Sequence, residues 1–487
     1  MTQTDRCPKL QRCAILTLSY FDGLEKARFG NRVFIAMRVL PASSPSLSTV
    51  VISALGGVLG GSVAALLVVG FTEVLKGMLA VISRQDTWVL ILVPLLGLTL
   101  SVLVLYRLGL TSETQGSQPP QWAAMWRSFP PGVARSHLTD DVVASAGVEE
   151  RFPWRLAPIH LLAICATVGL GGPMGTEAPA AYLGVATGAA LGTRWRRLLR
   201  PAAVGGGAAG VAVLMGIPLV GTAYILELER RHNAPLNAER VTAALVGGFV
   251  GWLLNIYLGV NLIRLVVPKE PPHSFYQAMI TALLIGALAG SITSISGAAI
   301  YRAKAWQANP VVQLALGGMA LGAAAVMISM IAVPSAAVGP GGGAIQWVET
   351  ATGAPALIVL AVDLLRALAT VGSAAAGGCG GLFVPFLAIG DLAGRVFAPS
   401  LKVPSDLAGA AGAAGGISGG YHLPFTAVAL VLSQGGPRLA VLTCLATVVV
   451  AGFAGTGSAL LVDRIRSRAQ AYVGKKPPTM ERDPYSF

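Results

Sequence analysis

One carboxylate stands where it could do chemistry. Glu177 lies within Gly175-Thr176-Glu177-Ala178-Pro179, inside a long apolar region. The small-residue run 171–175 breaks any helix that arrives from Pro158, so the pattern predicts a new helix that starts at Glu177. An ionisable residue at a helix start at membrane depth is typical of a functional site. The alternative is a surface loop with a solvated glutamate.

The composition is that of a chain that crosses a membrane several times. Of the 487 residues, 54% are hydrophobic and 12% are charged, and the mean hydropathy is +0.68. A soluble domain carries roughly 25% charged residues. Sixty glycines suit close helix packing in lipid, and the alternating pattern of an outer-membrane barrel is absent. We therefore expect an all-α integral membrane protein.

The net charge of +13 comes from basic residues at both ends and in a few loops, such as 194–197. In a membrane protein this indicates topology and contact with lipid headgroups, not nucleic-acid binding. We expect both termini to be cytoplasmic, in the cell (inner) membrane. A cytoplasmic tail with an amphipathic helix (1–46) precedes a transmembrane domain (47–463), and a basic tail (464–487) follows it. Within that domain we expect two halves, about 47–266 and 272–463.

Several classes of protein are disfavoured. The five cysteines are scattered, without metal-ligand or redox spacing. Gly341-Gly342-Gly343 lacks the lysine of a phosphate loop, and no Ser/His/Asp or His-Glu-x-x-His arrangement suggests a hydrolase. The N-terminus has no cleaved signal peptide pattern. We expect no enzyme activity, no cofactor and no metal.

The chain matches itself at a shift of 206 residues. Gly175, Pro179, Gly184 and Gly188 meet Gly381, Pro385, Gly390 and Gly394, and Gly206, Ala208, Gly210, Pro218, Ala223 and Leu226 meet Gly412, Ala414, Gly416, Pro424, Ala429 and Leu432. A break pattern shared by two halves predicts a transporter built from structural repeats, with its site where the broken helices meet. Three segments are too short for a ~20-residue span and predict partial or tilted helices: 177–193, 381–398 and 421–434.

The repeat also shows a difference between the halves. Glu177 in the first half faces Phe383 in the second. Helix N-termini carry unpaired N–H groups and roughly +0.5 of an elementary charge. Two of them that converge would coordinate an anion through backbone amides. A carboxylate at the same place would compete with that anion, which makes Glu177 a candidate gate.

Four segments together resemble the CLC chloride channels and chloride/proton antiporters. Residues 175–179 look like the family's G-R-E-G-P motif, and residues 381–385 look like G-x-F-x-P. Ile217–Gly221 with Tyr224–Glu227 is similar to A-P-L-A-G…I-E, and Leu423–Ala427 is similar to its second-half counterpart. The resemblance covers about residues 48–463.

The resemblance implies two inverted repeats with broken and tilted helices, a homodimer, and an anion pathway in each subunit. Glu177 matches the gating glutamate. The anion-binding positions that it implies are Ser128, Gly175, Thr176, Gly381, Leu382 and Phe383. Ser128 is the nearest match to the pore serine in a degraded G-S-G-I-P element, Arg127–Pro131.

Three departures from the family pattern bear on mechanism. Thr176 replaces the arginine of G-R-E-G-P, and Leu460 stands where the family has a pore tyrosine. The inner proton-relay glutamate of the antiporters falls at Leu228. Glu227 or Glu229 could substitute, although neighbouring helical positions point about 100° apart. Both can equally be a charged helix end.

Two further candidate sites are polar residues within apolar segments. His160 lies in an apolar segment where the family has a lysine, so it is either a buried cation or a hydrogen-bonded core histidine. Asp363 and Arg366 lie three residues apart in an apolar helix. That spacing predicts an ion pair on one helix face, with a structural role.

We expect transport of chloride or a similar small anion across the membrane, gated by protonation of Glu177, channel-like or weakly coupled to protons. The alternative within the family is a chloride/proton antiporter that uses Glu227 or Glu229, or a fluoride-transporting variant. The alternative from another class is a non-conducting membrane sensor or scaffold.

Overall fold

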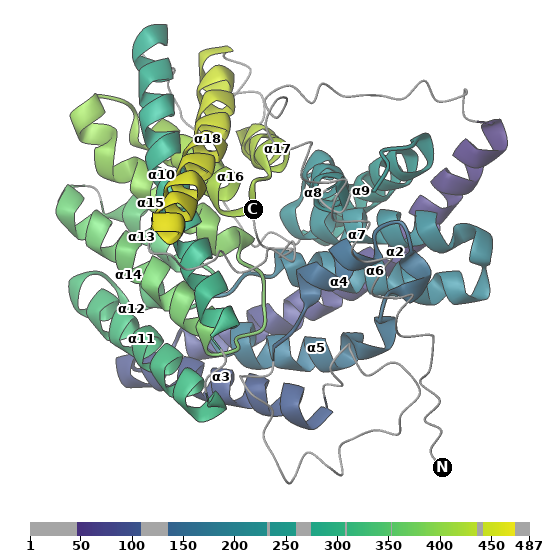
Figure 1. Ribbon diagram of the computed structural model, residues 1–487, viewed down its shortest axis with the longest axis horizontal. Coiled ribbons are helices and arrows are strands. Elements are labelled where there is room, and N and C mark those ends of the chain that lie inside the picture. Colours follow the sequence, from purple (N-terminus) through teal and green to yellow (C-terminus); the bar gives the residue numbers. More distant parts are fainter. Residues whose placement is uncertain are drawn as a thin grey trace, which may run out of the picture. The chain divides into compact units, whose positions relative to one another are not determined.

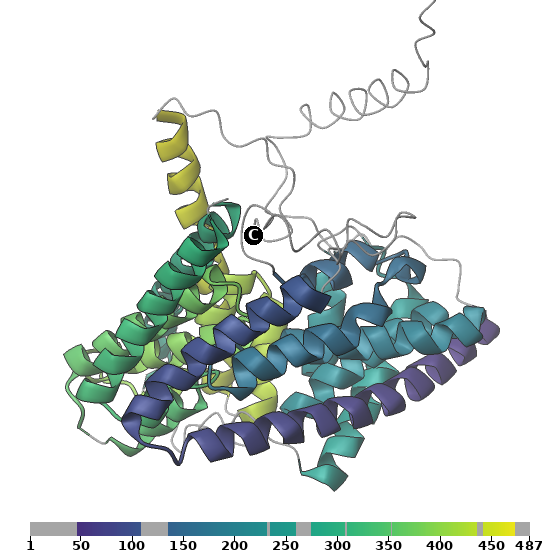
Figure 2. The same ribbon diagram turned by 90° about the horizontal axis from the view of Figure 1, so that it is seen from below.

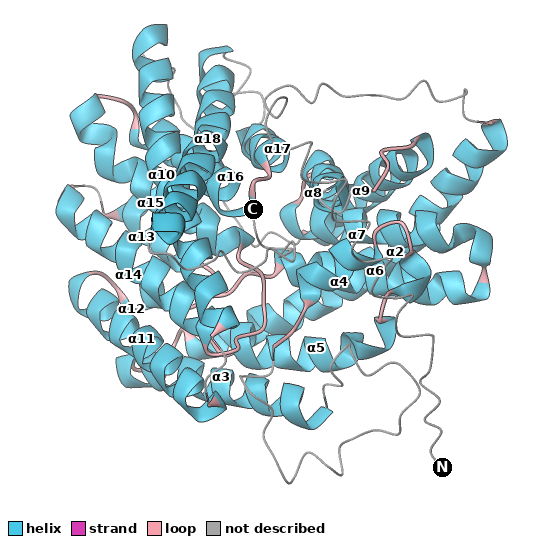
Figure 3. Cartoon of the chain, in the orientation of Figure 1, coloured by secondary structure: helices cyan, strands magenta, loops and turns pink. Residues whose placement is uncertain are grey.

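The computed structural model describes residues 46–108, 135–230, 234–259, 274–306, 309–351, 353–435 and 442–472. All of them fall in one structural unit, Ser46–Phe487. Within these ranges the elements are helices, apart from one isolated bridge between two glycines (Figure 3). Ten helices in the described part are long and apolar enough to cross a membrane. The expected all-α membrane fold is confirmed.

The first half contains α2 to α9. Their bounds are α2 Leu47–Ile82, α3 Thr87–Leu108, α4 Leu138–Ser145, α5 Ala157–Ile164, α6 Glu177–Arg194, α7 Leu199–Met215, α8 Pro218–Arg230 and α9 Ala238–Leu258. The long helix α2 packs against α7 and α9. Figure 2 shows it in dark purple alongside the teal helices of the same half.

The second half contains α10 to α18. Their bounds are α10 Phe275–Ala305, α11 Pro310–Ile331, α12 Pro334–Ala337, α13 Gly342–Thr350, α14 Ala356–Ala375, α15 Phe383–Leu401, α16 Ser405–Tyr421, α17 Pro424–Gly435 and α18 Leu442–Tyr472. Here α10 packs against α16 and α18, as α2 does against α7 and α9. In Figure 1 the green and yellow helices of this half lie together, and α3 of the first half lies beside α11.

Small residues hold the matching helices together. Gly184 of α6 meets the backbone of Gly206 in α7, so closely that a Cβ atom at either position would overlap the other's carbonyl. In the second half, Gly390 of α15 and Gly412 of α16 make the same contact. Close backbone approach at glycine is the usual means of packing helices in lipid, where apolar side chains gain little by leaving their surroundings. The repeat at 206 residues is therefore a repeat of packing as well as of sequence.

The two halves also break their helices at matching places. Gly216 ends α7 with a positive φ of 69°, and His422 ends α16 with a φ of 52°. A proline follows two residues later in each case, Pro218 and Pro424, at the first residue of the next helix. Proline suits a helix start because its missing N–H would have no helical partner there. The chain is therefore divided at both places into two helices, α7 and α8 in the first half and α16 and α17 in the second.

The predicted pair of Asp363 and Arg366 is wrong. Arg366 is 1% exposed and donates to the carbonyls of Ala336, Ala337 and Gly339 at distances of 2.9–3.2 Å. Neither carboxyl oxygen of Asp363 has a hydrogen-bond partner among the described residues. The i,i+3 spacing allowed the pair, but the last two residues of α12 and Gly339 in the loop that follows present three carbonyls to the guanidinium.

Candidate functional site

The starts of α6 and α15 meet at the centre of the two repeats. The N–H of Gly175 donates to the carbonyl of Gly381 at 2.6 Å, and the N–H of Gly381 donates to the carbonyl of Gly175 at 2.7 Å. These are the two residues that the 206-residue shift aligns. An antiparallel bridge between equivalent residues is what a two-fold relation between the halves produces. The broken helices meet where the repeat predicted.

Glu177 is the first residue of α6 and is fully buried. Its Oε2 accepts a long hydrogen bond of 3.4 Å from the N–H of Val384, in the first turn of α15. Its Oε1 lies 3.4 Å from the hydroxyl of Thr176, which is also buried. The carboxylate of the first half thus lies against the amide end of the helix from the second half.

No charged side chain among the described residues forms an ion pair with Glu177. The groups that stabilise its negative charge are therefore backbone amides and a hydroxyl. Helix N-termini supply such amides with a positive partial charge. A small anion could use the same amides, which is the chemistry that this arrangement permits.

On the second half, the amide of Leu382 has a hydroxyl partner. Its N–H donates to the hydroxyl of Tyr421 at 2.9 Å. The Tyr421 ring, at the end of α16, packs against Phe383 and Phe386 with ring centroids 6.0 Å and 5.8 Å apart. The ring of Tyr224, from α8, also packs against Phe383 in a T-shaped contact, with centroids 5.8 Å apart. Phe383 is therefore a fully buried wall of the site, and its side chain carries no polar group.

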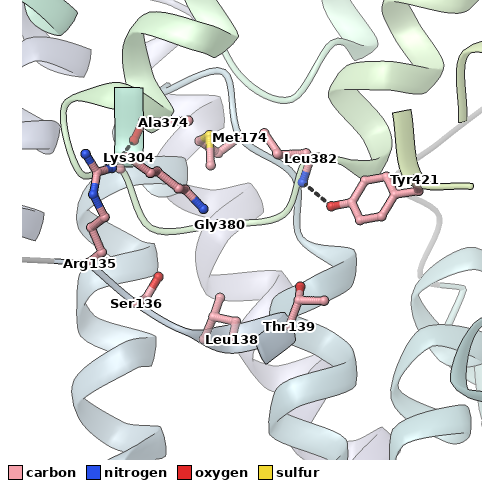
Figure 4. Close-up of a pocket in the computed structure, with 11 residues that line it drawn as sticks. Arg135, Ser136, Leu138, Thr139, Met174, Lys304, Ala374, Gly380, Leu382 and Tyr421 are labelled. Carbon is pink, nitrogen blue, oxygen red and sulfur yellow. Dashed lines mark hydrogen bonds between the residues drawn. The ribbon is translucent and has the colours of Figure 1, made fainter. Parts of the chain in front are cut away.

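A cavity of about 30 Å³ opens beside Leu382 and Tyr421 (Figure 4). A space of this size can hold a water molecule or a small ion. Ser136 and Thr139 contribute hydroxyls to its lining, and Arg135 and Lys304 contribute positive charge. None of the residues that line it is acidic. The cavity is therefore polar and electropositive, and suits an anion.

The predicted pore serine, Ser128, lies outside the described residues. Ser136 instead lines the cavity, just before the first residue of α4, Leu138. The sequence signal that could have found it is its place at a helix start, in Arg135-Ser136-His137-Leu138. Ser136 thus contributes a hydroxyl to the cavity from the segment before α4.

Leu460, where the resemblance expected a tyrosine, lies on α18 and is 49% exposed. Tyr421 contributes to the lining of the cavity from a different helix, α16. No motif in the sequence pointed to Tyr421. It is the last residue of α16, directly before His422, where the backbone is left-handed. Only the tertiary structure brings that turn to the start of α15.

Glu229 is part of a buried ionic network. Arg240, itself 1% exposed, donates to the carboxylates of Glu229 and Glu149. Arg200 donates to Glu149 at 3.1 Å and to Glu239 at 3.5 Å. These contacts join α8 and α9 to the segment that follows α4. Glu229 therefore has a structural role, because its ion pair with Arg240 holds α8 against α9.

Glu227 reaches across the repeats. Its carboxylate accepts hydrogen bonds from the N–H groups of Phe425, at 3.1 Å, and Thr426, at 2.7 Å, and the Thr426 hydroxyl also donates to it. These amides belong to the first turn of α17, so Glu227 acts as an N-terminal cap supplied by another helix. Leu228 between the two glutamates is buried.

His160 is a core histidine. It is 7% exposed and its ring packs against that of Tyr182, with centroids 5.1 Å apart. Its Nδ1 has no hydrogen-bond partner in the described ranges. His160 does not line the cavity.

The family model for voltage gated chloride channels matches residues 122–456, well over half of the chain. The protein belongs to this family. The resemblance seen in the four sequence motifs is therefore confirmed. Residues 175–179 and 381–385, which form the central bridge, both fall inside the matched range.

Curated relatives and solved structures agree with the family. The H(+)/Cl(-) exchange transporter ClcA of Yersinia pestis bv. Antiqua (strain Angola) is 24% identical over 356 residues, which cover 68% of this chain and 73% of the relative. ClcA of Cronobacter sakazakii (strain ATCC BAA-894) is 25% identical over 358 residues, with the same coverage.

Two solved structures share the fold. A CLC-type fluoride/proton antiporter superposes with a TM-score of 0.60 at 21% identity, over 84% of this chain and 94% of its own. A slow cyanobacterial Cl-/H+ antiporter superposes with a TM-score of 0.62 at 19% identity, over 87% of this chain and 99% of its own.

Proposed function

We propose that the protein moves chloride or a similar small anion across the membrane, and that protonation of Glu177 gates the movement. The observation that carries the proposal is the contact between the Glu177 carboxylate and the N–H of Val384. This carboxylate is held as an anion would be held, by amides at the start of a helix. Relatives whose names describe H+/Cl− exchange support chloride as the substrate.

Ionised, Glu177 competes with the transported anion for the amides at the start of α15. Protonated, it has no negative charge to hold it there, and the anion replaces it. The amides of Leu382 and Phe383 and the hydroxyls of Tyr421 and Ser136 would then surround the anion. Gly175 and Gly381 keep the two helix starts close together through the paired backbone hydrogen bonds of the bridge, and Thr176 places its hydroxyl beside the Glu177 carboxylate.

The inner proton site decides between channel-like flux and antiport. The relay position is Leu228, which cannot titrate. Glu229 is committed to Arg240, and separating that pair would leave a buried charge, at a cost of ~3–5 kcal/mol. Glu227 caps α17 and is half-buried. These contacts favour anion flux with weak or no proton coupling.

Antiport through Glu227 is the second candidate, because its carboxylate is partly exposed and joins the two repeats. A fluoride-transporting variant and a non-conducting sensor or scaffold are the remaining candidates. We further propose a homodimer in the cell (inner) membrane with both termini cytoplasmic, as the charge distribution predicted.

Flux from liposomes that contain the purified protein tests the proposal. We expect chloride efflux with little proton movement, and a strong dependence on pH. Glu177→Gln should keep or raise the flux and remove most of that dependence. The matched control is Glu73→Gln, at an exposed carboxylate on α2, which should behave as wild type.

The other outcomes assign the function differently. Proton uptake driven by a chloride gradient would support the antiporter, and fluoride efflux without chloride efflux would support the fluoride variant. If no halide moves, transport is refuted and the sensor or scaffold remains. If Glu177→Gln keeps the wild-type pH profile, Glu177 is not the gate.

A further inference from the structure

The charges around the cavity come from two elements far apart in the sequence. Arg135 precedes α4 in the first half, and Lys304 lies in the last turn of α10 in the second half. We infer that Lys304 draws anions into the cavity beside Leu382 and sets the affinity with which they bind there, an inference that rests on the proposed function.

The lining of the cavity supports an anionic ligand. It includes two cationic side chains and three hydroxyls, on Ser136, Thr139 and Tyr421, and no carboxylate. Leu382 also lines the cavity, and its N–H donates to the hydroxyl of Tyr421. A cation would find no negative group here, whereas an anion would find donors on several sides.

The side chains of Arg135 and Lys304 lie in different surroundings. The guanidinium of Arg135 donates to the carbonyls of Ala374 and Ala375, the latter at 2.8 Å, at the end of α14. Those carbonyls carry the negative partial charge of a helix C-terminus. The hydrogen bonds of Arg135 therefore connect the end of α14 to the segment before α4. Figure 4 shows the Lys304 side chain extended from α10 toward Gly380, on the loop that leads into α15.

Lys304 also acts electrostatically on the residue next to Ser136. The hydrogen bond to Asp140 raises the pKa of the His137 imidazole, which lies outside the spanning helices, while burial and the charge of Lys304 lower it. Lys304 from the second half and Ser136 from the first half line the same cavity.

The position also contrasts with the sequence around Glu177. Thr176 stands where family members have an arginine, so no cationic side chain accompanies Glu177 at the start of α6. The positive charge near the pathway is supplied instead at the cavity, on the Leu382 side. Lys304 thus adds positive charge to the lining of the cavity, which includes no carboxylate.

Equilibrium binding of chloride to the purified full-length protein, measured by calorimetry, tests this inference without relying on flux. We expect Lys304→Gln to raise the chloride dissociation constant about five- to tenfold, equivalent to ~1–1.4 kcal/mol. Lys304→Arg should stay within about threefold of wild type, because it keeps the charge. The half-saturation concentration of chloride in liposome flux should rise in parallel.

Arg302→Gln is the matched control. Arg302 lies in the same last turn of α10, is exposed, and does not line the cavity. It removes the same charge, so a general loss of surface potential would affect both variants equally. Equal effects of the two variants, or no effect of Lys304→Gln, would overturn the inference, provided that both elute and melt as wild type does.

Binding and flux also separate this inference from the proposed function. If wild type binds chloride but does not conduct it, transport is refuted, and the dissociation constant of Lys304→Gln still decides the role of Lys304. If wild type conducts chloride and Lys304→Gln binds it normally, the inference is refuted and transport stands. If wild type binds no chloride at all, Lys304 is not an anion-recruiting residue.

Discussion

At the start of α6, Thr176 and Glu177 bring a buried hydroxyl and a carboxylate to the centre of the protein. At the start of α15, the equivalent Leu382 and Phe383 bring a backbone amide and an aromatic wall, and Tyr421 supplies the hydroxyl from a third helix. The backbones pair through Gly175 and Gly381 almost symmetrically. The two halves are therefore alike in how their backbones pack and differ in the side chains that they bring to the site.

This loss of symmetry has a physical reason. Two carboxylates facing each other at a buried bridge would repel one another, and one of them would be driven to bind a proton. Two apolar helix starts would hold an anion with nothing to gate it. One carboxylate and one helix start without a carboxylate give a site in which the ionised carboxylate and a bound anion exclude each other.

The largest effects should follow from breaking the shared packing. A Cβ at Gly188 or at Gly394 would overlap the carbonyl of Ala202 or Ala408, its counterpart. We expect Gly188→Val and Gly394→Val each to destabilise the protein by about 3 kcal/mol, measured as loss of thermal stability in detergent. Gly70→Val and Gly457→Val, where a Cβ meets nothing within 4 Å, are the controls. If only one of the two substitutions, Gly188→Val or Gly394→Val, is tolerated, the packing of the two halves is not equivalent.

A smaller effect separates the two sides of the bridge. A Cβ at Gly175 would fall on Oε2 of Glu177 and lie 3.1 Å from Cδ of Pro385. We expect Gly175→Ala to cost about 1–2 kcal/mol and to displace the carboxylate, which weakens the pH dependence of flux. At Gly381 the nearest atom is the Ala178 nitrogen, also at 3.1 Å, and the carboxylate oxygen is 3.4 Å away. Gly381→Ala should therefore keep the pH profile, and identical profiles in both variants would contradict the asymmetry.

Tyr421→Phe removes the hydroxyl of the second half while keeping its ring packing. We expect a stability loss of about 1 kcal/mol, because the N–H of Leu382 loses its partner. The chloride dissociation constant, measured by calorimetry, should rise about fivefold. Tyr257→Phe, at a tyrosine that is 79% exposed on α9, controls for loss of a phenol. Unchanged chloride affinity would remove Tyr421 from the site.

The smallest effect is expected at Glu227. Glu227→Gln should lower stability by about 0.5–1 kcal/mol, because the charge at the start of α17 is lost. Any chloride-driven proton movement should stay as in wild type, measured with a pH electrode outside the liposomes. A specific loss of proton movement would instead make Glu227 the inner proton site.

Much of the fold could be predicted from local chemistry. Glycine and proline runs fixed the starts of α6 and α15, and their common spacing revealed the repeat. Glu177 was found because a carboxylate inside an apolar stretch is conspicuous. These signals are local, so one sequence carries them in full.

The rest depends on contacts between distant segments. Ser136 and Tyr421 reach the cavity only because α4, α15 and α16 converge there, and no spacing in the sequence records that. Asp363 and Arg366 show the opposite error, since their i,i+3 spacing favoured a pair but the guanidinium donates to carbonyls at the end of α12 and just after it. For Glu229, the partner that explains its burial, Arg240, comes from the next helix.

Proton-linked chloride binding tests the central claim most directly. Chloride titrations by calorimetry in buffers of different ionisation enthalpy report how many protons are taken up for each anion bound. If chloride displaces the Glu177 carboxylate from the start of α15, wild type should take up a substantial fraction of a proton per chloride, and Glu177→Gln should take up none while binding chloride more tightly. Equal proton uptake by the two proteins would contradict the account.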